Sequence, residues 1–316
     1  MNIPNFINLL SDWLVGENEI SLLPRQKWIQ VIVLYEVQDY SIFRTESGEE
    51  LNTEELIVDG EKIAFPVLLG RKLKAVQRRT GHAIIRSVRD EYACKFETAE
   101  GGVTGLCRKC PECFLRGAAG GRGEEYNIQS RVFYSAYYAI EPERLITDLF
   151  TRNAIDDLVK VTGAALTSNQ VIKPQAHIPA IFSLYSVTER ELIYFLKTVQ
   201  RARRVGARVT EGGLIKPISV AITGYRYELL SPLELSLHVY KLLKNDIENL
   251  WKIPTEKIVN ALKSFVKKRA EAVGASLIID KDFLTEADKV SDLDLVENLF
   301  QKEVKKYLSE IEEYLG

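Results

Sequence analysis

The sequence predicts an α+β fold with a ferredoxin-like, RRM-type core in the order β-α-β-β-α-β. Strand-like apolar runs alternate with two amphipathic helical segments, and long polar stretches separate them. The last part of the chain has helical periodicity throughout. A chain of 316 residues with 46% hydrophobic and 27% charged residues is long enough and apolar enough to bury a sizeable globular core.

Each core element follows from its composition and spacing. Strands are expected at 27–37, 126–140, 178–186 and 214–223, where β-branched and aromatic residues are concentrated. Helices are expected at 67–80, ended by Gly81, and at 188–204, where Thr188 and Glu191 form a capping box and Gly206 marks the end. A short strand is expected at 82–89. Further helices are expected at 5–14, 232–249, 254–273 and 293–315.

The charges are distributed unevenly along the chain. The net charge is −2, but residues 66–134 hold 13 Lys/Arg against 7 Asp/Glu, and residues 150–227 hold 11 against 5. The first core helix has no acidic residue between Lys62 and Asp90. An exposed helix face normally mixes both signs. The pattern therefore predicts a surface that binds a polyanion, with an ordinary basic helix face as the alternative.

Both core helices are expected to present their cations to solvent. On the first helix, Arg71, Lys74 and Arg78 share the face opposite the apolar stripe, and Lys72 and Arg79 lie beside that stripe. On the second helix, the outer face carries Arg190, Lys197 and Arg201. The core plan places both helices on one side of the sheet, so the two cationic faces are expected to border one groove.

All four cysteines occur in one segment that lacks apolar periodicity. Cys107, Cys110 and Cys113 are spaced C-x₂-C-x₂-C, and Cys94 precedes them by 13 residues. Four thiolates satisfy tetrahedral Zn²⁺, and a metal would stabilise a segment that has no core of its own. We expect a structural zinc site. An iron–sulfur cluster, disulfides, and His82 in place of Cys94 are the alternatives.

Three other patterns allow a structural and a functional interpretation. The glycine-rich stretch 117–123 lacks the Lys-Ser/Thr of a phosphate-binding P-loop and is expected to be a flexible hinge, with a disordered, basic-tipped loop that RNA orders as the alternative. Tyr134 and Tyr138 are expected to pack in the core, although RRM modules stack bases on such side chains. The acidic pair Asp156 and Asp157 suits a turn, or a metal-dependent ribonuclease.

Several of these segments together are similar to one known family. They are GRKLKAVQRRTG on the first helix, the cysteine-rich insertion, TRNAIDD followed by VIKP, and the T-x-x-E helix that leads to RRVGARVTEGG. Over roughly residues 25–230 the chain resembles the backbone subunit of type I-D CRISPR interference complexes, a Cas-seven-type RAMP protein.

The resemblance implies a non-catalytic protein that binds single-stranded CRISPR RNA irrespective of its sequence. The implied partners are that RNA, further copies of the chain and other CRISPR effector subunits. It implies phosphate contacts from Arg71, Lys72, Lys74, Arg78, Arg79, Arg152, Lys173, Arg201, Arg203, Arg204 and Arg208. The alternatives are a ribonuclease that uses Asp156 and Asp157, and a zinc-stapled protein-interaction scaffold.

The same reasoning divides the chain into six segments. The first half of the core with an acidic insertion is 1–89, the zinc-binding insertion 90–125, a core strand 126–140, a thumb or lid insertion 141–176, the second half of the core 177–230, and a helical region 231–316. No run of 18 apolar residues and no basic N-terminal stretch occur, so neither a membrane span nor a secretory signal is expected. A cytoplasmic location is the default.

Overall fold

The structure is a computed structural model that describes residues 3–44, 51–99, 102–120, 126–155, 162–250 and 252–315. The strands are β1 (Trp28–Val37), β2 (Thr53–Val58), β3 (Glu61–Leu69), β4 (Glu97–Ala99), β5 (Gly102–Thr104), β6 (Val132–Phe133), β7 (Ala136–Tyr138), β8 (Thr147–Ile155), β9 (Thr162–Ile172), β10 (His177–Tyr185), β11 (Ile215–Tyr225) and β12 (Ser276–Ile279). The helices are α1 (Gly70–Val88), α2 (Pro111–Arg116), α3 (Glu143–Ile146), α4 (Glu189–Arg201), α5 (Pro232–Leu250), α6 (Thr255–Val273), α7 (Phe283–Asp288), α8 (Asp292–Leu299) and α9 (Lys305–Leu315). Two 3-10 segments, η1 (Asn5–Trp13) and η2 (Glu17–Glu19), and a π-helical turn, η3 (Phe300–Val304), complete the elements.

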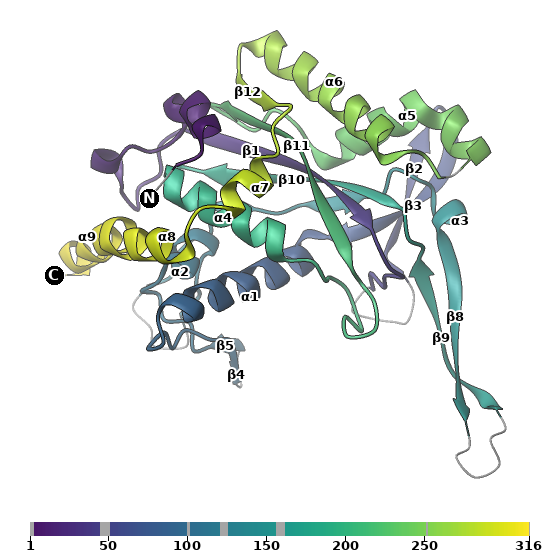
Figure 1. The fold of residues 1–316 in the computed structure, drawn as a ribbon, viewed down its shortest axis with the longest axis horizontal. Coiled ribbons are helices and arrows are strands. Elements are labelled where there is room, and N and C mark those ends of the chain that lie inside the picture. The colour runs from purple at the N-terminus through teal and green to yellow at the C-terminus, as the bar shows by residue number, and fades with distance from the viewer. Residues whose placement is uncertain are drawn as a thin grey trace.

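A five-stranded antiparallel sheet in the order β12-β11-β1-β10-β6 forms the centre of the molecule (Figure 1). In its central strand, Val31 pairs with Phe182 of β10 and with Ile222 of β11. Every residue from Ile29 to Tyr35 is buried. Helices cover both faces of the sheet, which explains why β1 is a continuous apolar run rather than an alternating one.

Successive side chains of β1 point to opposite faces, and each face has its own helical layer. Val31, Val33 and Tyr35 belong to the core that also contains residues of α1 and α4. Ile32 and Leu34 belong to a second core, formed with α5 and α6. The mixed α+β character, the antiparallel sheets and the helical C-terminal region are therefore confirmed.

The first core helix is longer than predicted. It continues through Gly81 to Val88, so the strand expected at 82–89 is wrong. A Cβ atom on Gly81 would lie 1.8 Å from Oε1 of Glu112 in α2 and 2.6 Å from the hydroxyl of Tyr194 in α4. The glycine permits this close approach of three helices and does not mark a helix end.

The strand expected at 126–140 is two short strands in different sheets. β6 pairs with β10 in the central sheet, whereas β7 pairs with β3 in a three-stranded sheet of order β2-β3-β7. Between them, the hydroxyl of Tyr134 donates to Oε1 of Gln77 on α1, at 2.7 Å. Tyr137 is fully buried and Phe133 is 37% exposed. The aromatic run thus bends around the core.

The segment 141–176 contains a long antiparallel hairpin, β8–β9, that projects from the body of the protein (Figure 1). Its sequence is polar and poorly periodic because a projecting hairpin has little core to face. The strand-like residues 170–172 lie in β9, and the strand-like run at 158–161 lies outside the described residues. Strand β12 was not expected, because it is a four-residue run between two helices.

The C-terminal elements cover the face of α4 that was expected to be open. Lys197 is fully buried, and its Nζ donates to the carbonyl oxygens of Asp288 and Val290 at 2.9 and 2.6 Å. Arg190 is 8% exposed and its Nε donates to Oε1 of Glu303 at 2.8 Å. The prediction of an exposed cationic face on α4 is therefore wrong. Those cations hold the tail in place.

The environment of Glu303 makes the docking of the tail sensitive to pH. Glu303 is 1% exposed, and the hydroxyl of Thr188 donates to its Oε1 at 2.7 Å. Burial, followed by repulsion from Glu191, raises the pKa of Glu303 to about 7, against the attraction of Arg190. Glu191 is held by Arg131 and by the Tyr307 hydroxyl, at 2.8 and 3.1 Å.

We predict that Gly81→Ala destabilises the protein by about 1–3 kcal/mol, because the added Cβ has no room beside Glu112 and Tyr194. Alanine is the better helix former, so propensity alone predicts the opposite sign. Urea unfolding monitored by circular dichroism measures the change. The control is Ser87→Ala at an exposed position of the same helix, expected within about 0.5 kcal/mol of wild type. A stabilised Gly81→Ala variant would contradict the close packing.

We predict that the free energy of unfolding falls as pH rises through 7 because Glu303 must ionise in the folded state. Its folded pKa of about 7 lies above the unfolded value of 4.5, so the stabilisation is complete below pH 4.5 and is lost above 7. Between pH 5 and 8, wild type should lose about 2–3 kcal/mol more than Glu303→Gln does. Denaturation at both pH values measures this difference. Parallel pH profiles for the two proteins would disprove it.

Candidate metal centre and cationic surface

The C-x₂-C-x₂-C motif forms a turn that leads directly into α2. Arg108 adopts a left-handed conformation, with φ of 54°, in the turn between Cys107 and Cys110. Pro111 begins α2, where a missing N–H costs nothing, and Cys113 lies in the first turn of that helix. Cys94 reaches the same point from the loop that follows α1. The local sequence thus brings four thiols together from a loop, a turn and a helix.

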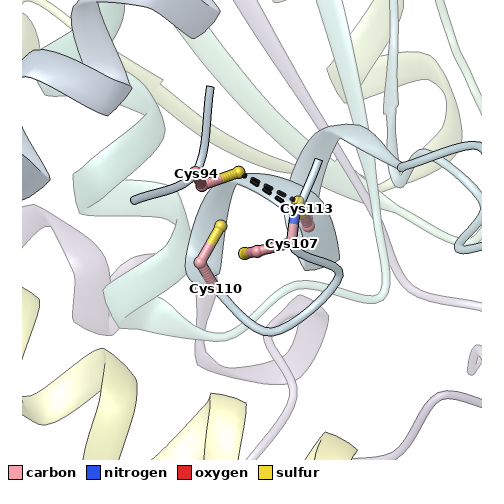
Figure 2. A group of neighbouring side chains, drawn as sticks. All are labelled: Cys94, Cys107, Cys110 and Cys113. Atoms are coloured by element: carbon pink, nitrogen blue, oxygen red, sulfur yellow. Dashed lines mark hydrogen bonds between the residues drawn. The ribbon is translucent and has the colours of Figure 1, made fainter. Parts of the chain in front are cut away.

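The four sulfur atoms of Cys94, Cys107, Cys110 and Cys113 all lie within 4.8 Å of one another (Figure 2). The Sγ atoms of Cys94 and Cys113 are 3.8 Å apart, and all four cysteines are free of disulfides. Backbone N–H groups of Cys107 and Lys109 donate to Sγ of Cys94 and of Cys107, each at 3.3 Å. Convergent soft ligands with donors aimed at them are the arrangement of a metal centre.

The electrostatics of the cluster also favour a bound cation. Hydrogen bonding from Cys107, and then from Cys110 and Cys113, lowers the pKa of Cys94. Burial raises the pKa of Cys110, which is 1% exposed. The Cys94 thiolate thus lies beside buried thiols in a site that is largely shielded from water, where a metal ion would compensate its charge and displace the remaining protons.

Two residues of α1 lie beside the cluster. Nη2 of Arg78 is 3.8 Å from Sγ of Cys113, and its guanidinium lies 5.2 Å from the ring centroid of Phe96. His82 lies 2.9 Å from the hydroxyl of Tyr92, which donates to Sγ of Cys110 at 3.0 Å. His82 therefore meets the cluster through Tyr92. Arg78 is 6% exposed, so its expected place on an open RNA-binding face is wrong.

The remaining cations of α1 stay accessible. Arg71 and Arg79 are exposed, and Lys72 and Lys74 are half-buried. Partial burial, reinforced by the positive charges of Arg78 and Arg116, lowers the pKa of Lys74. A nearby anion would relieve this accumulation of positive charge. These four side chains form a cationic surface along the first half of α1.

The loop between α4 and β11 supplies a second set of cations. Backbone carbonyl groups of the loop fix Arg203 and Arg204, which donate to Ile215 and Gly212 oxygens at 2.8 Å each. Arg208 has a φ of 51° and borders a hollow of about 90 Å³. A Cβ atom on Gly206, whose φ is 107°, would lie 2.5 Å from the carbonyl oxygen of Ile42. The loop thus has a defined conformation and packs on residues 39–43.

Two aromatic side chains in this hollow escaped the sequence analysis. Tyr40 and Phe150 are 40% and 44% exposed, and their ring centroids are 5.2 Å apart. Tyr40 follows β1 and Phe150 lies near the base of the β8–β9 hairpin, so nothing in the sequence pairs them. In the sequence, each is simply an aromatic residue within a polar stretch, which does not distinguish it as a site residue.

The other predicted RNA contacts occupy different environments. Arg201 is bound by Asp288 and Asp292, each at 2.6 Å, so its charge is already matched. Lys173 follows β9, with its Nζ 3.4 Å from the carbonyl oxygen of Leu145. Arg152 lies in β8 opposite Thr167. The acidic pair Asp156 and Asp157 lies outside the described residues.

Comparison with known proteins identifies the family. The sequence model of the Csc2 CRISPR family matches residues 16–307. The chain belongs to this Csc2 family. No curated protein matched it significantly.

Solved structures share its fold. The crystal structure of Thermofilum pendens Csc2 has a TM-score of 0.67 at 21% identity, with 98% of each chain covered. A chain of a pre-nicking CRISPR RNA-guided surveillance complex has a TM-score of 0.53 at 10% identity, covering 88% of this chain and 99% of the other. A chain of a second CRISPR RNA-guided surveillance complex has a TM-score of 0.50 at 10% identity, covering 85% and 92%. The expected resemblance to a CRISPR protein is thus confirmed at the level of the Csc2 family.

No membrane span was expected from the sequence. Within the part of the chain that the structure describes, no helix is both long and apolar enough to cross a bilayer.

We predict that the purified protein holds one metal ion per chain and that Cys94→Ser lowers this content to well below one. Loss of one of four thiolates opens the site and weakens binding. Elemental analysis by mass spectrometry measures the stoichiometry, and thermal unfolding shows the accompanying loss of stability. His82→Gln is the control and should retain the metal, since the ring contacts the cluster through Tyr92. Metal loss from His82→Gln alone would reverse the ligand assignment.

Proposed function

We propose that this chain is the non-catalytic backbone subunit of a type I-D CRISPR interference complex. In this role it binds single-stranded CRISPR RNA through its phosphates, beside further copies of itself and other effector subunits. Membership of the Csc2 family and the likeness in fold to chains of RNA-guided surveillance complexes support the assignment. A cytoplasmic location fits it, because such a compartment also keeps the four cysteines reduced.

The observation that carries the RNA-binding part is the cationic surface of α1. Arg71, Lys72, Lys74 and Arg79 remain at least partly exposed on a helix that has no acidic residue. Lysine and arginine contacts with phosphate give affinity without base preference, which suits a subunit whose guide sequences vary. Arg203, Arg204 and Arg208 continue this surface in our proposal, with Arg152 and Lys173 near the hairpin. Arg78 is buried beside Cys113 and Arg201 is paired with Asp288 and Asp292, so neither belongs to the proposed RNA-binding surface.

A ferredoxin-like core underlies this proposal. The sheet order β11-β1-β10-β6 corresponds to the order 4-1-3-2 of that plan, with β6 as its second strand. The helices α1 and α4 would be its two crossovers, and both share one hydrophobic core with β1 and β10. In this view the hairpin β8–β9 is the thumb, and the segment from Cys94 to the end of α2 is the metal module.

The metal of that module is zinc in our proposal, with a structural role. Four sulfurs at a Zn–S distance of about 2.3 Å would be roughly 3.8 Å apart in a tetrahedron. The separation of 3.8 Å between Sγ of Cys94 and Sγ of Cys113 fits this value. Cys94, Cys107, Cys110 and Cys113 would hold the ion and leave no position for a substrate.

A salt series of RNA binding tests the function. We expect wild type to bind an unstructured 30-nucleotide RNA with a steep salt dependence. The triple variant Arg71→Gln/Lys74→Gln/Arg79→Gln should bind at least tenfold more weakly, with a log–log slope shallower by about 2, since each lost phosphate contact removes about 0.7. Fluorescence anisotropy between 50 and 300 mM salt would measure both.

The matched control removes three lysines from α6, on the other side of the sheet (Figure 1). Lys263→Gln/Lys267→Gln/Lys268→Gln changes the net charge equally and should leave the slope unchanged. If both triple variants lost the same RNA affinity, the effect would come from net charge alone, and the assigned surface would be refuted. Mg²⁺-dependent RNA cleavage that Asp157→Ala abolishes would replace the proposal with a nuclease.

A further inference from the structure

A large apolar hollow lies beside α9. Helix α9 is at the end of the molecule opposite the β8–β9 hairpin (Figure 1). Its volume is about 870 Å³. The start of β1, the edge strand β6, the preceding segment 126–131 and α9 surround it. The RNA-binding proposal uses none of these elements.

The floor of the hollow is aromatic. The rings of Trp28 and Tyr185 stack with centroids 4.2 Å apart, because the two residues pair across β1 and β10. Phe133 of β6 lies 5.4 Å from Trp28 and is 37% exposed. Stacked rings of this kind offer a wide, rigid apolar contact area.

The rim leaves further apolar side chains in water. Tyr314 and Leu315 at the end of α9 are 90% and 45% exposed, and Leu23 before β1 is 81% exposed. Single exposed apolar residues are common on proteins, but several around one aromatic-floored hollow mark an interaction surface.

The charges at this surface argue against a nucleic acid and for a basic partner. Among the described residues, the charged side chains that line the hollow are Arg131, Glu310 and Glu313. Both carboxylate oxygens of Glu191 bind Arg131, which cancels its charge. Glu310 and Glu313 therefore make the rim negative, so it repels phosphate and attracts lysine or arginine.

The edge strand β6 is poorly suited to pair with an added β-strand from a partner. The hydroxyl of Ser130 lies 3.4 Å from the amide nitrogen of Val132 and donates to its carbonyl oxygen at 2.8 Å. Since β6 is only two residues long and Ser130 contacts both polar backbone groups of Val132, we expect an occupant to bind mainly through side chains. A helix presents apolar anchors at i, i+3, i+4 and i+7 to such a groove.

We propose that this hollow docks a short amphipathic helix of another protein, with apolar anchors on one face and lysine or arginine beside them. The anchors lie on Trp28, Tyr185 and Phe133, and the basic flank meets Glu310 and Glu313. Docking there places the partner against α9 and against the segment 126–131.

A designed peptide tests the surface. The probe is a fluorescein-labelled 14-residue peptide of leucine and lysine, with leucine on one helical face. The comparison peptides are a scrambled one of equal composition and one with glutamate in place of lysine. We expect the amphipathic lysine peptide to bind the full-length protein at least tenfold more tightly than either comparison peptide, as measured by fluorescence anisotropy.

Variants at the rim localise the binding. Tyr314→Ser/Leu315→Ser should weaken it at least tenfold, because both side chains are exposed and their loss spares the core. Leu242→Ser, at a 60% exposed position of α5, is the matched control and should have no effect. Glu313→Lys should weaken the lysine peptide and strengthen the glutamate peptide.

Three results would overturn the proposal. Equal peptide binding by wild type and Tyr314→Ser/Leu315→Ser would place the peptide elsewhere. If the 30-nucleotide RNA displaces the lysine peptide, and still does so from the α1 triple variant, the hollow would be a nucleic-acid site. Self-association in sedimentation experiments that Tyr314→Ser/Leu315→Ser abolishes would make it a contact between copies of this chain.

Discussion

The buried ion pair within α2 is the interaction on which the arrangement of the sites depends. Arg116 and Glu112 are both fully buried and 2.6 Å apart. Arg116 also donates to the hydroxyls of Tyr134 and Thr198, at 3.0 and 2.5 Å. A buried guanidinium is stable only when its donors are paired, and the partners of Arg116 lie on α2, on α4 and between β6 and β7, so they hold α2 in one position. That position places Cys113 beside Arg78 and determines which face α1 turns outward.

The cations of this protein divide into structural and accessible groups by their acidic neighbours. Arg190, Lys197 and Arg201 meet Glu303, Asp288 and Asp292 of the C-terminal elements. Arg190 and Glu303 are both buried, so breaking this pair would leave a charge without its partner, which costs several kcal/mol and keeps the tail docked. The accessible cations lie on α1, which has no acidic residue, and on the loop after α4, where Asp39 and Glu211 line the same hollow as Arg208. Burial of charge, rather than its sequence density, therefore outlines the surface proposed to bind RNA.

Elements with their own local signal were predictable from the sequence, and contacts between distant segments were not. The strand β1, the capping box of α4 and the cysteine spacing depend on neighbours within a few residues. Gly81 was misinterpreted because its constraint comes from Glu112 and Tyr194, which are distant in the chain. The face of α4 was misjudged for the same reason, since amphipathic periodicity cannot reveal a second layer packed over a cationic face.

The same argument explains why the two ends of the molecule suit different partners. Helix α1 carries no acidic residue among its positive charges, which suits the polyanion proposed to bind there. Around α9 the exposed feature is apolar surface, and the accessible charges of the described lining residues are negative. Phosphate contacts lose strength with salt, whereas apolar contacts do not. In the proposed role, a subunit with both surfaces would hold RNA loosely enough to assemble along it while a protein partner fixes its end.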